Sequence, residues 1–367
     1  MLHIGIDDTD SVKGGCTTWL ATEIIKELSD FDLIGSPRLV RLNPNVPWKT
    51  RGNGAVSFTF GKGKGNKKKI GEIGGSNIFS FESGVSIDYN SQEILERIKV
   101  LVLQHSHSDS EPGIVVSDVF LPEGLYWQGV TDIVTDAILS DALQGTISFG
   151  FRGSRGICGA ACSLAWSGNS NNINKISHTW ELIGYREKSN WGEKRDISAE
   201  SVNKVSDLKG VFSCIDLDGK IAMVPNSPCP VLWGFRGTED SILIDNFHNL
   251  GPEKPVRWLL YRTNQATDDH LRSKEILNVK EGDCIRAEVA VSSIPETIEG
   301  GHRFFSVKDH FDESIKCAAF EPSKDFRHII DKLVIGDKLI ICGSVNNGTL
   351  NLEKIRILEL VTRYSKP

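Results

Sequence analysis

The sequence predicts an α+β protein of more than one domain that ends in a small β-barrel. Its length of 367 residues exceeds that of most single domains. Up to about residue 272, apolar runs typical of strands alternate with apolar patterns of helical period. From about residue 274, short strands follow one another with a single helical segment among them.

The composition is that of an ordinary globular protein, with a formal net charge of −6. This charge is not typical of a nucleic-acid-binding protein, although local basic patches matter more than the total. The eight cysteines are scattered without a CxxC pair, which favours reduced thiols over a zinc site. Because no apolar run approaches membrane-spanning length and no signal segment is recognisable, we expect a cytoplasmic protein.

The first residues combine a strand, an acidic cluster and a helix. The apolar run Leu2–Ile6 predicts a buried strand, and apolar positions of helical period predict a helix over Thr18–Leu28. Between them lie three carboxylates and a glycine turn: Asp7, Asp8, Asp10, Gly14 and Gly15. Carboxylates suit Mg²⁺, and a helix start after a glycine turn suits an anion. We interpret the segment as a site for a metal-bound nucleotide phosphate. Capping of the helix and solvation of a loop are the alternative.

Two predicted strands, Pro37–Leu42 and Ala55–Phe60, flank a polar loop that carries Lys49 and Arg51. Loops of this length in compact domains are often functional. We therefore treat the two cations as candidates for contacts with an acidic partner.

The run Gly61–Lys69, which includes Lys67 and Lys68, is basic and rich in glycine. It is either a flexible loop that contacts phosphates on RNA or a solvated hairpin tip. The sequence does not choose between the two interpretations.

A second glycine-rich stretch, residues 149–168, follows two predicted helices and a strand, over Ser91–Gln104, Tyr126–Leu143 and Ile114–Val116. It carries Arg152 and Arg155 and leads into a helix of small residues. Such a loop suits a phosphate, although it lacks the GK[ST] ending of a Walker A motif. The alternative is a tightly packed helix that requires small residues.

The following hundred residues predict three strands, two helices and a hairpin. The strands are His178–Arg186, Pro228–Gly237 and Val256–Asp269; the helices are Ser198–Leu208 and Ser241–Leu250; the hairpin joins Val211–Asp216 to Ile221–Val224. The last strand runs into a polar loop, which indicates a binding site or a well-capped turn.

The C-terminal segments predict an OB-fold, because three strands, a helix and two strands follow in that order. They are Cys284–Ile294, His302–Lys308, Ile315–Phe320, the helix Phe326–Val334, Lys338–Val345 and Leu350–Glu359. OB-folds commonly bind single-stranded or looped nucleic acid. Arg303, Phe304 and Lys308 on the second strand could supply charge and stacking there. Taken together, the acidic cluster, the glycine–arginine loop and the OB-fold indicate an ATP-dependent enzyme that acts on RNA or DNA.

Seven segments carry a resemblance to one family. They are IGIDDTDS (4–11), GGCTTWLA (14–21), PRLVRLNPNVPWKTRGNGAV (37–56), RGSRGICGA (152–160), HTWELIGYR (178–186), PVLWGFRG (230–237) and RTNQATDDHL (262–271). In this order they resemble the archaeal tRNA(Ile) 2-agmatinylcytidine synthetases, or agmatine–tRNA(Ile) ligases.

The resemblance implies a reaction and a domain plan. The family uses ATP and Mg²⁺ to join agmatine to C2 of the wobble cytidine in the CAU anticodon of tRNA(Ile), through a phosphorylated cytidine. The product, 2-agmatinylcytidine, decodes AUA. The plan implied is a kinase-like α/β catalytic domain (residues 1–60 and about 130–196), ferredoxin-like and connecting segments (about 61–129 and 197–272) and an OB-fold (273–367).

The resemblance also implies roles for residues. The catalytic and magnesium-binding carboxylates would be Asp7, Asp8 and Asp10, with Thr18 as the phosphorylated threonine. Phosphate contacts are expected from Gly15, Thr17, Arg152, Gly153, Arg155 and Gly156. The guanidinium of agmatine would bind Glu181, Asp268 or Asp269. Contacts with tRNA are expected from Lys49, Arg51, Lys67, Lys68, Arg303, Phe304 and Lys308.

One departure from the family concerns zinc. The family usually ends in a Cys-rich zinc ribbon, whereas this sequence has no CxxC pair, so zinc is not expected in this chain. Two other functions remain as alternatives. The first is a Mg²⁺-dependent phosphohydrolase that uses the N-terminal aspartates. The second is a noncatalytic RNA-binding protein in which the OB-fold dominates.

Overall fold

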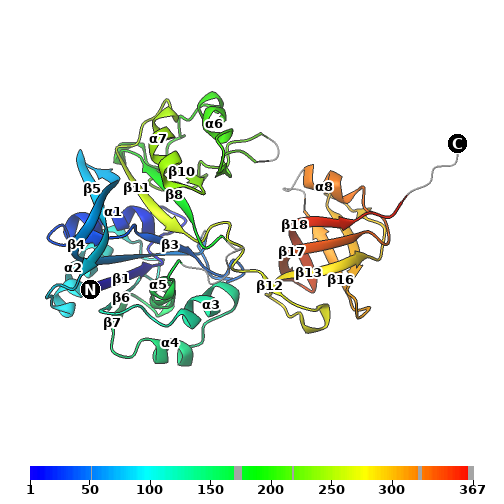
Figure 1. Cartoon of the computed structure of the whole chain (residues 1–367), viewed down its shortest axis with the longest axis horizontal. Coiled ribbons are helices and arrows are strands. Elements are labelled where there is room, and N and C mark those ends of the chain that lie inside the picture. The colour runs from blue at the N-terminus through cyan, green and yellow to red at the C-terminus, as the bar shows by residue number, and fades with distance from the viewer. Residues whose placement is uncertain (51, 169–175, 217–218, 321–324, 363–367) are drawn as a thin grey trace. The chain divides into compact units, whose positions relative to one another are not determined.

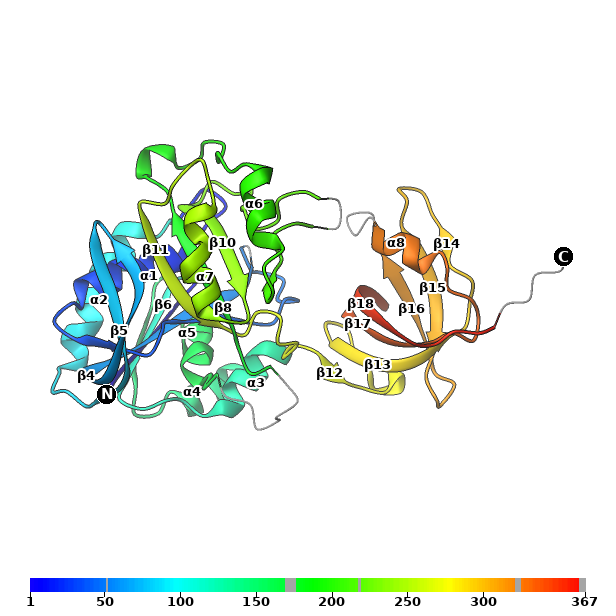
Figure 2. The same ribbon diagram turned by 45° about the horizontal axis from the view of Figure 1, so that its top comes forward.

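The computed structural model describes residues 1–50, 52–168, 176–216, 219–320 and 325–362. The chain divides into two compact units, with Asp268 in the first and Asp269 in the second. The first unit is a mixed α/β layer structure and the second is a barrel (Figures 1 and 2). Among the described residues, no helix is both long and apolar enough to cross a membrane.

The first unit is built on a mixed sheet with the strand order β7-β6-β1-β4-β3-β11-β8-β10-β9, from which β2 and β5 branch through β4. The strands are β1 (Leu2–Asp7), β2 (Asp32–Ile34), β3 (Arg38–Arg41), β4 (Gly54–Ile73), β5 (Ser76–Val85), β6 (Gly113–Ser117), β7 (Ile147–Gly150), β8 (Thr179–Tyr185), β9 (Val211–Phe212), β10 (Val231–Gly237) and β11 (Arg257–Thr263). All six residues of β1 are buried, because the strand lies inside the sheet and both of its faces are covered.

Helices cover both faces of this sheet. They are α1 (Thr17–Glu27), α2 (Ser91–His105), α3 (Glu123–Thr131), α4 (Asp136–Ala142), α5 (Arg155–Ala165), α6 (Ala199–Ser206) and α7 (Asp240–Asn246). One apolar core joins α1 and α2 to Ile4, Ile6 and Phe58. A second core joins α3 and α5 to Val40 and Val115 on the other face. Since neighbouring strand residues point to opposite faces, each helix layer has its own core.

Three sequence expectations differ from the structure in this unit. In place of the hairpin predicted to join Val211–Asp216 to Ile221–Val224, the described residues there form one short strand, β9, which pairs with β10, and an isolated bridge between Ile215 and Ile221. The basic run Gly61–Lys69 is neither a flexible loop nor a hairpin tip but part of β4, whose partner is β5. Gly63 allows this pairing because the ring of Phe81 occupies the space where its Cβ would lie. The single helix expected over Tyr126–Leu143 is two helices, since α3 ends at Thr131 and Thr135 caps α4.

The second unit is a closed barrel in which the strand order β13-β17-β18-β16-β15 returns to β13. Its strands are β12 (Arg272–Ser273), β13 (Cys284–Val291), β14 (Glu296–Thr297), β15 (Arg303–Lys308), β16 (Ser314–Ala319), β17 (Lys338–Asn346) and β18 (Thr349–Glu359), and α8 (Asp325–Ile330) lies between β16 and β17 in the chain. This confirms the predicted order of elements. Phe305, Ile341 and Leu350 pack in the barrel interior.

Candidate active site

The strand register brings several functional candidates together where β1, β3 and β10 end. We call this end of the large sheet the site edge. Ile6 of β1 and Leu39 of β3 both lie opposite Val56 of β4, so β1 and β3 end at the same edge. The carboxyl end of β10 reaches this edge as well, because β10 runs antiparallel to β8 and β8 runs antiparallel to β11. Ends of neighbouring strands are common places for ligand sites in α/β sheets.

Asp7 is the last residue of β1 and is 9% exposed. Its side chain lies directly against Gly159 of α5, where any Cβ would overlap Asp7 Oδ2. Burial, together with the neighbouring charge of Asp8, raises the pKa of Asp7 well above its ordinary range. A cation beside this carboxyl group would favour its charged form.

Asp8 adopts a left-handed backbone conformation, with φ of +54°. Its Oδ2 accepts a hydrogen bond from the backbone N–H of Glu111 at 3.2 Å. Burial raises the pKa of Asp8 to about 6, and the nearby charges of Asp10 and Glu111 act in the same direction. Neither Asp7 nor Asp8 forms an ion pair with the described residues.

The three carboxylates predicted as magnesium ligands do not converge. Among the described residues, no group of three or more His, Cys, Asp or Glu side chains is arranged to hold a metal ion. A complete protein cage for a metal is therefore absent from this part of the chain.

The turn before α1 is shaped by glycine and by a neighbouring loop. Gly14 and Gly15 have φ of +145° and +73°, which favours glycine at both positions. The ring of His107 lies 3.4 Å from the Cβ that any other residue would place at position 15. Ser11 donates to Asp109 at 3.0 Å. The turn is thus held against the loop that contains His107 and Asp109.

Thr17 and Thr18 occupy the first turn of α1. Thr17 Oγ1 accepts a hydrogen bond from Thr9 at 3.0 Å. The carbonyl oxygen of Thr18 accepts hydrogen bonds from the hydroxyl groups of Tyr185 and Tyr261, at 2.8 and 2.7 Å. Both tyrosines are buried in the sheet. They fix the backbone of Thr18 and leave its side chain out of these contacts.

Arg152 braces the backbone of the neighbouring loop. It donates to the carbonyl oxygens of Ser110 and His107 at 2.7 and 2.8 Å. These bonds use Nε and Nη2 of an exposed side chain, so the predicted phosphate contact of Arg152 stays a prediction.

Arg155, at the start of α5, remains accessible. Its side chain is 52% exposed and lies 3.4 Å from Glu111, with the ring of Trp48 at 5.3 Å. Gly156 packs on the backbone of Gly113, and Gly153 packs on Glu111. Both interpretations of this glycine-rich stretch thus have support: its glycines allow tight packing, and one of its arginines can still reach a ligand.

Glu181 lies between two arginines at the same edge of the sheet. Its Oε2 is 2.9 Å from Arg41 Nη2, and its Oε1 is 3.0 Å from both Nε and Nη2 of Arg236. Burial alone would raise the pKa of Glu181, but Arg236 and Arg41 lower it to about 2. Both carboxylate oxygens are thus engaged by arginines, and the agmatine contact expected for this residue stays a prediction.

The other predicted residues of the first unit are dispersed. Asp268, with φ of +63°, and Asp269 lie where the two units divide. Lys49 donates to the carbonyl oxygen of Pro44, and Arg51 lies outside the described residues. In the β4–β5 hairpin, Lys67 lies over the ring of Phe79, whereas Lys68 forms an ion pair with Asp240 at 2.6 Å.

In the barrel, the predicted RNA contacts are partly occupied. Arg303 pairs with Asp331, and Lys308 pairs with Asp312 at 2.5 Å. Phe304 lies under the ammonium group of Lys316.

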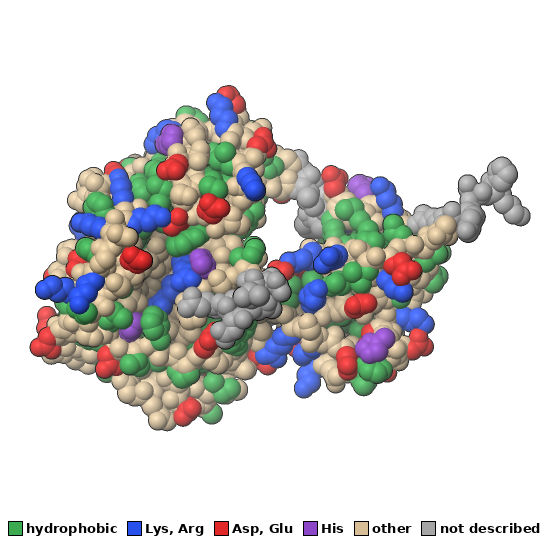
Figure 3. Space-filling model, in the orientation of Figure 1, with side chains coloured by type: hydrophobic (Ala, Val, Ile, Leu, Met, Phe, Trp, Pro, Cys, Tyr) green, Lys and Arg blue, Asp and Glu red, His purple; other side chains and the backbone are tan. Residues whose placement is uncertain are grey.

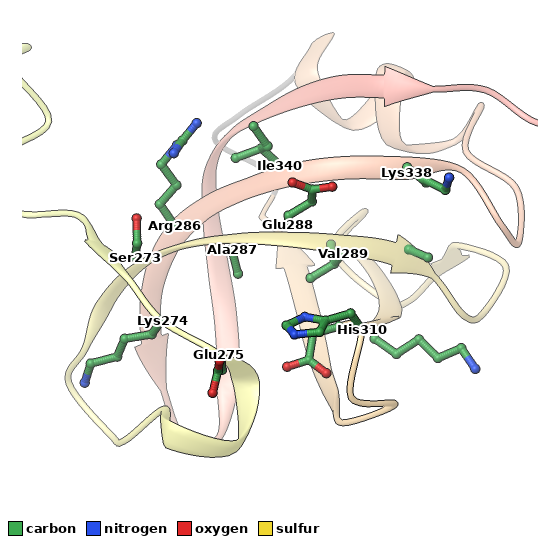
Figure 4. A pocket seen from close by; sticks show the side chains of 13 residues that line it. Ser273, Lys274, Glu275, Arg286, Ala287, Glu288, Val289, His310, Lys338 and Ile340 are labelled. Carbon is green, nitrogen blue, oxygen red and sulfur yellow. The ribbon is translucent and has the colours of Figure 1, made fainter. Parts of the chain in front are cut away.

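A cavity of about 710 Å³ lies over β13 and β17 of the barrel. Figure 4 shows Arg286 and Glu288 of β13 beside Ile340 of β17 at this cavity. Its other cations are Lys274, Lys308 and Lys338. Glu275, Glu288 and Asp309 also line it, so the cavity carries charges of both signs.

Sequence reasoning did not single out three groups at the site. These are the loop with His107, Asp109 and Glu111, the tyrosines that hold Thr18, and the arginines that flank Glu181. Arg41 and Arg236 each stand at the end of a predicted strand, which is the signal that could have identified them.

Comparison with known proteins places these features in a family. Residues 3–150 match the family model of the TiaS TCKD domain, and residues 154–270 match that of the TiaS FLD domain. A relative from Methanosarcina acetivorans, an isoleucine-tRNA 2-agmatinylcytidine synthetase named TiaS, is 37% identical over 98% of this chain and 82% of its own length.

Two solved structures are similar to the whole chain. A complex of TiaS with the isoleucine tRNA and ATP superposes with a TM-score of 0.82 at 31% identity, over 98% of this chain and 82% of that chain. A complex of TiaS with the isoleucine tRNA, AMPCPP and agmatine superposes with a TM-score of 0.81 at 29% identity, over 98% and 83%. The chain belongs to the TiaS family of tRNA(Ile) 2-agmatinylcytidine synthetases.

Proposed function

We propose that this chain is a ligase that uses ATP to join agmatine to the wobble cytidine of the isoleucine tRNA with the CAU anticodon. The match to a named synthetase along 98% of the chain carries this proposal. The related structures that hold the isoleucine tRNA, ATP and agmatine support the same three substrates. Eight free cysteines and a tRNA substrate favour a cytoplasmic location.

The proposed chemistry has two steps. A phosphoryl group from ATP is transferred to O2 of the cytidine, which turns that oxygen into part of a phosphate leaving group. The amine nitrogen of agmatine then bonds to C2 while the C2–O2 bond breaks and phosphate departs. Phosphoryl transfer needs positioning and charge stabilisation more than covalent help. The first turn of α1, which contains Thr18, could supply both, because a helix start favours an anion.

The carboxylates fit Mg²⁺ that arrives with ATP better than a resident metal. Mg²⁺ is usually bound by one or two carboxylates together with substrate phosphates and water. Asp7 is buried and Asp8 half-buried, and neither forms an ion pair with the described residues, so a cation would favour their charged forms. We propose Asp8 as a ligand, with Asp7 and Asp10 completing the acidic field. When bound, Mg²⁺ would neutralise charge on the phosphates.

The domain plan is also a proposal. We assign the kinase-like domain to the sheet region around β1, α1 and α5, and the ferredoxin-like domain to the region of β8, β10 and β11. The closed barrel with one helix suits an OB-fold. Its cavity, with Arg286, Lys274 and Lys338 around it, is a candidate contact with tRNA phosphates.

Consumption of ATP tests this function against both alternatives. We expect ATP to be consumed only when the isoleucine CAU tRNA and agmatine are both present. A transcript with uridine at the wobble position serves as the matched control and should not support turnover. Phosphate release from small phosphoesters without tRNA would favour a phosphohydrolase, and tRNA binding without ATP turnover would favour a noncatalytic RNA-binding protein.

A further inference from the structure

We infer that Arg41 and Arg236, held by the buried carboxylate of Glu181, form a phosphate-binding site in front of the first turn of α1. This inference rests on the proposed function, because it assigns residues to a phosphate group of the substrates. It adds two cations to a site that was so far described by the carboxyl groups of Asp7 and Asp8.

The position of the arginines follows from the strand register. Glu181 of β8 lies directly opposite Tyr261 of β11 and opposite Arg236 of β10. Residues that face each other in this way point to the same face of a sheet. Tyr261 reaches the carbonyl oxygen of Thr18 on that face. The Glu181 cluster therefore lies beside the start of α1.

Arg41 extends this cluster along the edge of the sheet. β3 runs parallel to β11, with Arg38 opposite Arg262, so Arg41 lies beyond the last residue of β11. Asn264 fixes it there, because its side chain accepts from the backbone N–H of Arg41 at 2.6 Å and donates to the carbonyl oxygen of Arg41 at 2.9 Å. The guanidinium is thus held in front of α1 from a rigid strand end.

The charge of the cluster favours an anion. Two guanidinium groups share one carboxylate, which leaves a net charge of about +1 on the cluster. Glu181 is 3% exposed in its side chain, whereas the side chains of Arg41 and Arg236 are 29% and 23% exposed. The carboxylate is buried behind the arginines, and the arginines face outward.

The arginines also retain hydrogen-bonding capacity. A guanidinium carries five N–H donors, and Glu181 accepts at only two oxygens. Arg41 Nε is buried without a hydrogen-bond partner in the described structure. A buried donor without a partner is costly, and an anion with several oxygens at this position would relieve the cost.

A phosphate group suits this geometry better than a single carboxylate. Its oxygens can accept from two guanidinium groups at once, and the positive end of the α1 dipole favours the same charge. Gly52 and Gly54 lie near Arg41 Nη1 without a side chain to block it. Lys and Arg side chains are visible inside a hollow of the first unit in Figure 3.

Calorimetric binding of tripolyphosphate to the intact protein tests the inference. We expect Arg41→Gln and Arg236→Gln to weaken binding by ~10- to 100-fold each, as for the loss of a charge-assisted hydrogen bond. Arg41→Lys and Arg236→Lys keep the charge and should recover part of the affinity. The control is Arg186→Gln, which removes another buried arginine that pairs with Glu253 at 2.7 Å.

Two sources could supply the phosphate, and the experiment separates them. If the site binds the ATP phosphates, Arg236→Gln weakens tripolyphosphate and ATP binding but leaves binding of the anticodon stem–loop unchanged. If it binds the tRNA backbone, the stem–loop is weakened and its salt dependence becomes shallower. Either result supports a phosphate site at these arginines.

The inference is overturned if both glutamine variants bind tripolyphosphate and the stem–loop as the wild type does while thermal unfolding shows them folded. It is also overturned if Arg186→Gln weakens binding equally, because the effect is then structural. Failure of the proposed function is recognised separately, since the wild type itself would then not convert ATP in the presence of the isoleucine CAU tRNA and agmatine.

Discussion

Two acidic regions at the site edge differ in how their charge is balanced. At Asp7 and Asp8, burial and neighbouring acids raise the pKa values. At Glu181, two arginines overcome the effect of burial and lower the pKa to about 2. Within the described chain, Asp7 and Asp8 form no ion pair. At Glu181, two arginines pair with one carboxylate. This difference is consistent with the two proposals made above, a cation that arrives with the substrate near Asp8 and a phosphate group at Arg41 and Arg236.

The largest effect is expected from Asp8→Asn. Asparagine tolerates the left-handed backbone of this position, so the variant removes the charge without straining the turn. We expect ATP turnover to fall by a factor of about 10³ or more, as for loss of a group that stabilises charge in the transition state, while tRNA binding is retained. Rates of ATP consumption and filter binding of tRNA measure the two effects. Asp109→Asn, on the adjacent loop, is the control, and turnover retained in Asp8→Asn would place the metal elsewhere.

Thr18→Ala tests the Thr18 hydroxyl group as the acceptor of a phosphoryl group. The tyrosine hydroxyl groups bind the carbonyl oxygen of Thr18 and not its side chain, so α1 should keep its position. We expect the variant to lose incorporation of phosphate from γ-labelled ATP into the protein. Thr17→Ala should retain the label. A labelled Thr18→Ala protein would reassign the phosphate acceptor.

The two regions should affect stability in opposite directions as pH changes. A folded-state pKa of about 6 for Asp8 means that its protonated form stabilises the fold below about pH 4, and that this contribution is lost as pH rises through about 6. The lowered pKa of Glu181 contributes stability above about pH 4.5 that is lost as pH falls towards 2.

Thermal unfolding midpoints measured between pH 3 and pH 7 check this prediction. Asp8→Asn should flatten the curve between about pH 4 and 6, and Glu181→Gln should flatten its acidic end. A curve for Asp8→Asn that keeps the shape of the wild type would show that the Asp8 carboxyl group is not perturbed by burial.

The smallest effect is expected at the β4–β5 hairpin, where two lysines with different contacts can be compared. Lys68 is paired with Asp240, whereas Lys67 lies over Phe79. If the hairpin contacts tRNA, Lys67→Ala should reduce the slope of log affinity against log salt by about 0.7 to 0.9, the value of one phosphate contact. Lys68→Ala should change it less. Equal slopes in both variants and the wild type would show that these hairpin lysines do not contact tRNA phosphates.

The sequence predicted the parts of the molecule that depend on local patterns. The strand at Leu2–Ile6, the helix from Thr18 and the order of the barrel strands all follow from apolar periodicity, and they are confirmed. The aspartates and Arg155 were also recognisable, because chemically active residues next to a strand or a helix start form a local signal.

Pairings between distant segments could not be predicted in the same way. Arg41 and Glu181 are 140 residues apart in the chain, and only the sheet order brings them together. Arg152 was expected at phosphate, yet it binds carbonyl oxygens of a loop more than 40 positions earlier. The basic run in β4 was ambiguous because its lysines follow no apolar alternation, and its strand character depends on the partner residue Phe81.

Incorporation of radiolabelled agmatine into the isoleucine CAU tRNA transcript, in the presence of ATP and Mg²⁺, tests the proposed reaction. We expect label at the wobble cytidine, recovered as 2-agmatinylcytidine after nuclease digestion, and no label when ATP is omitted. Absence of label in the tRNA, together with absence of phosphate on Thr18, would contradict the assignment of the active site to the edge formed by β1, β3 and β10.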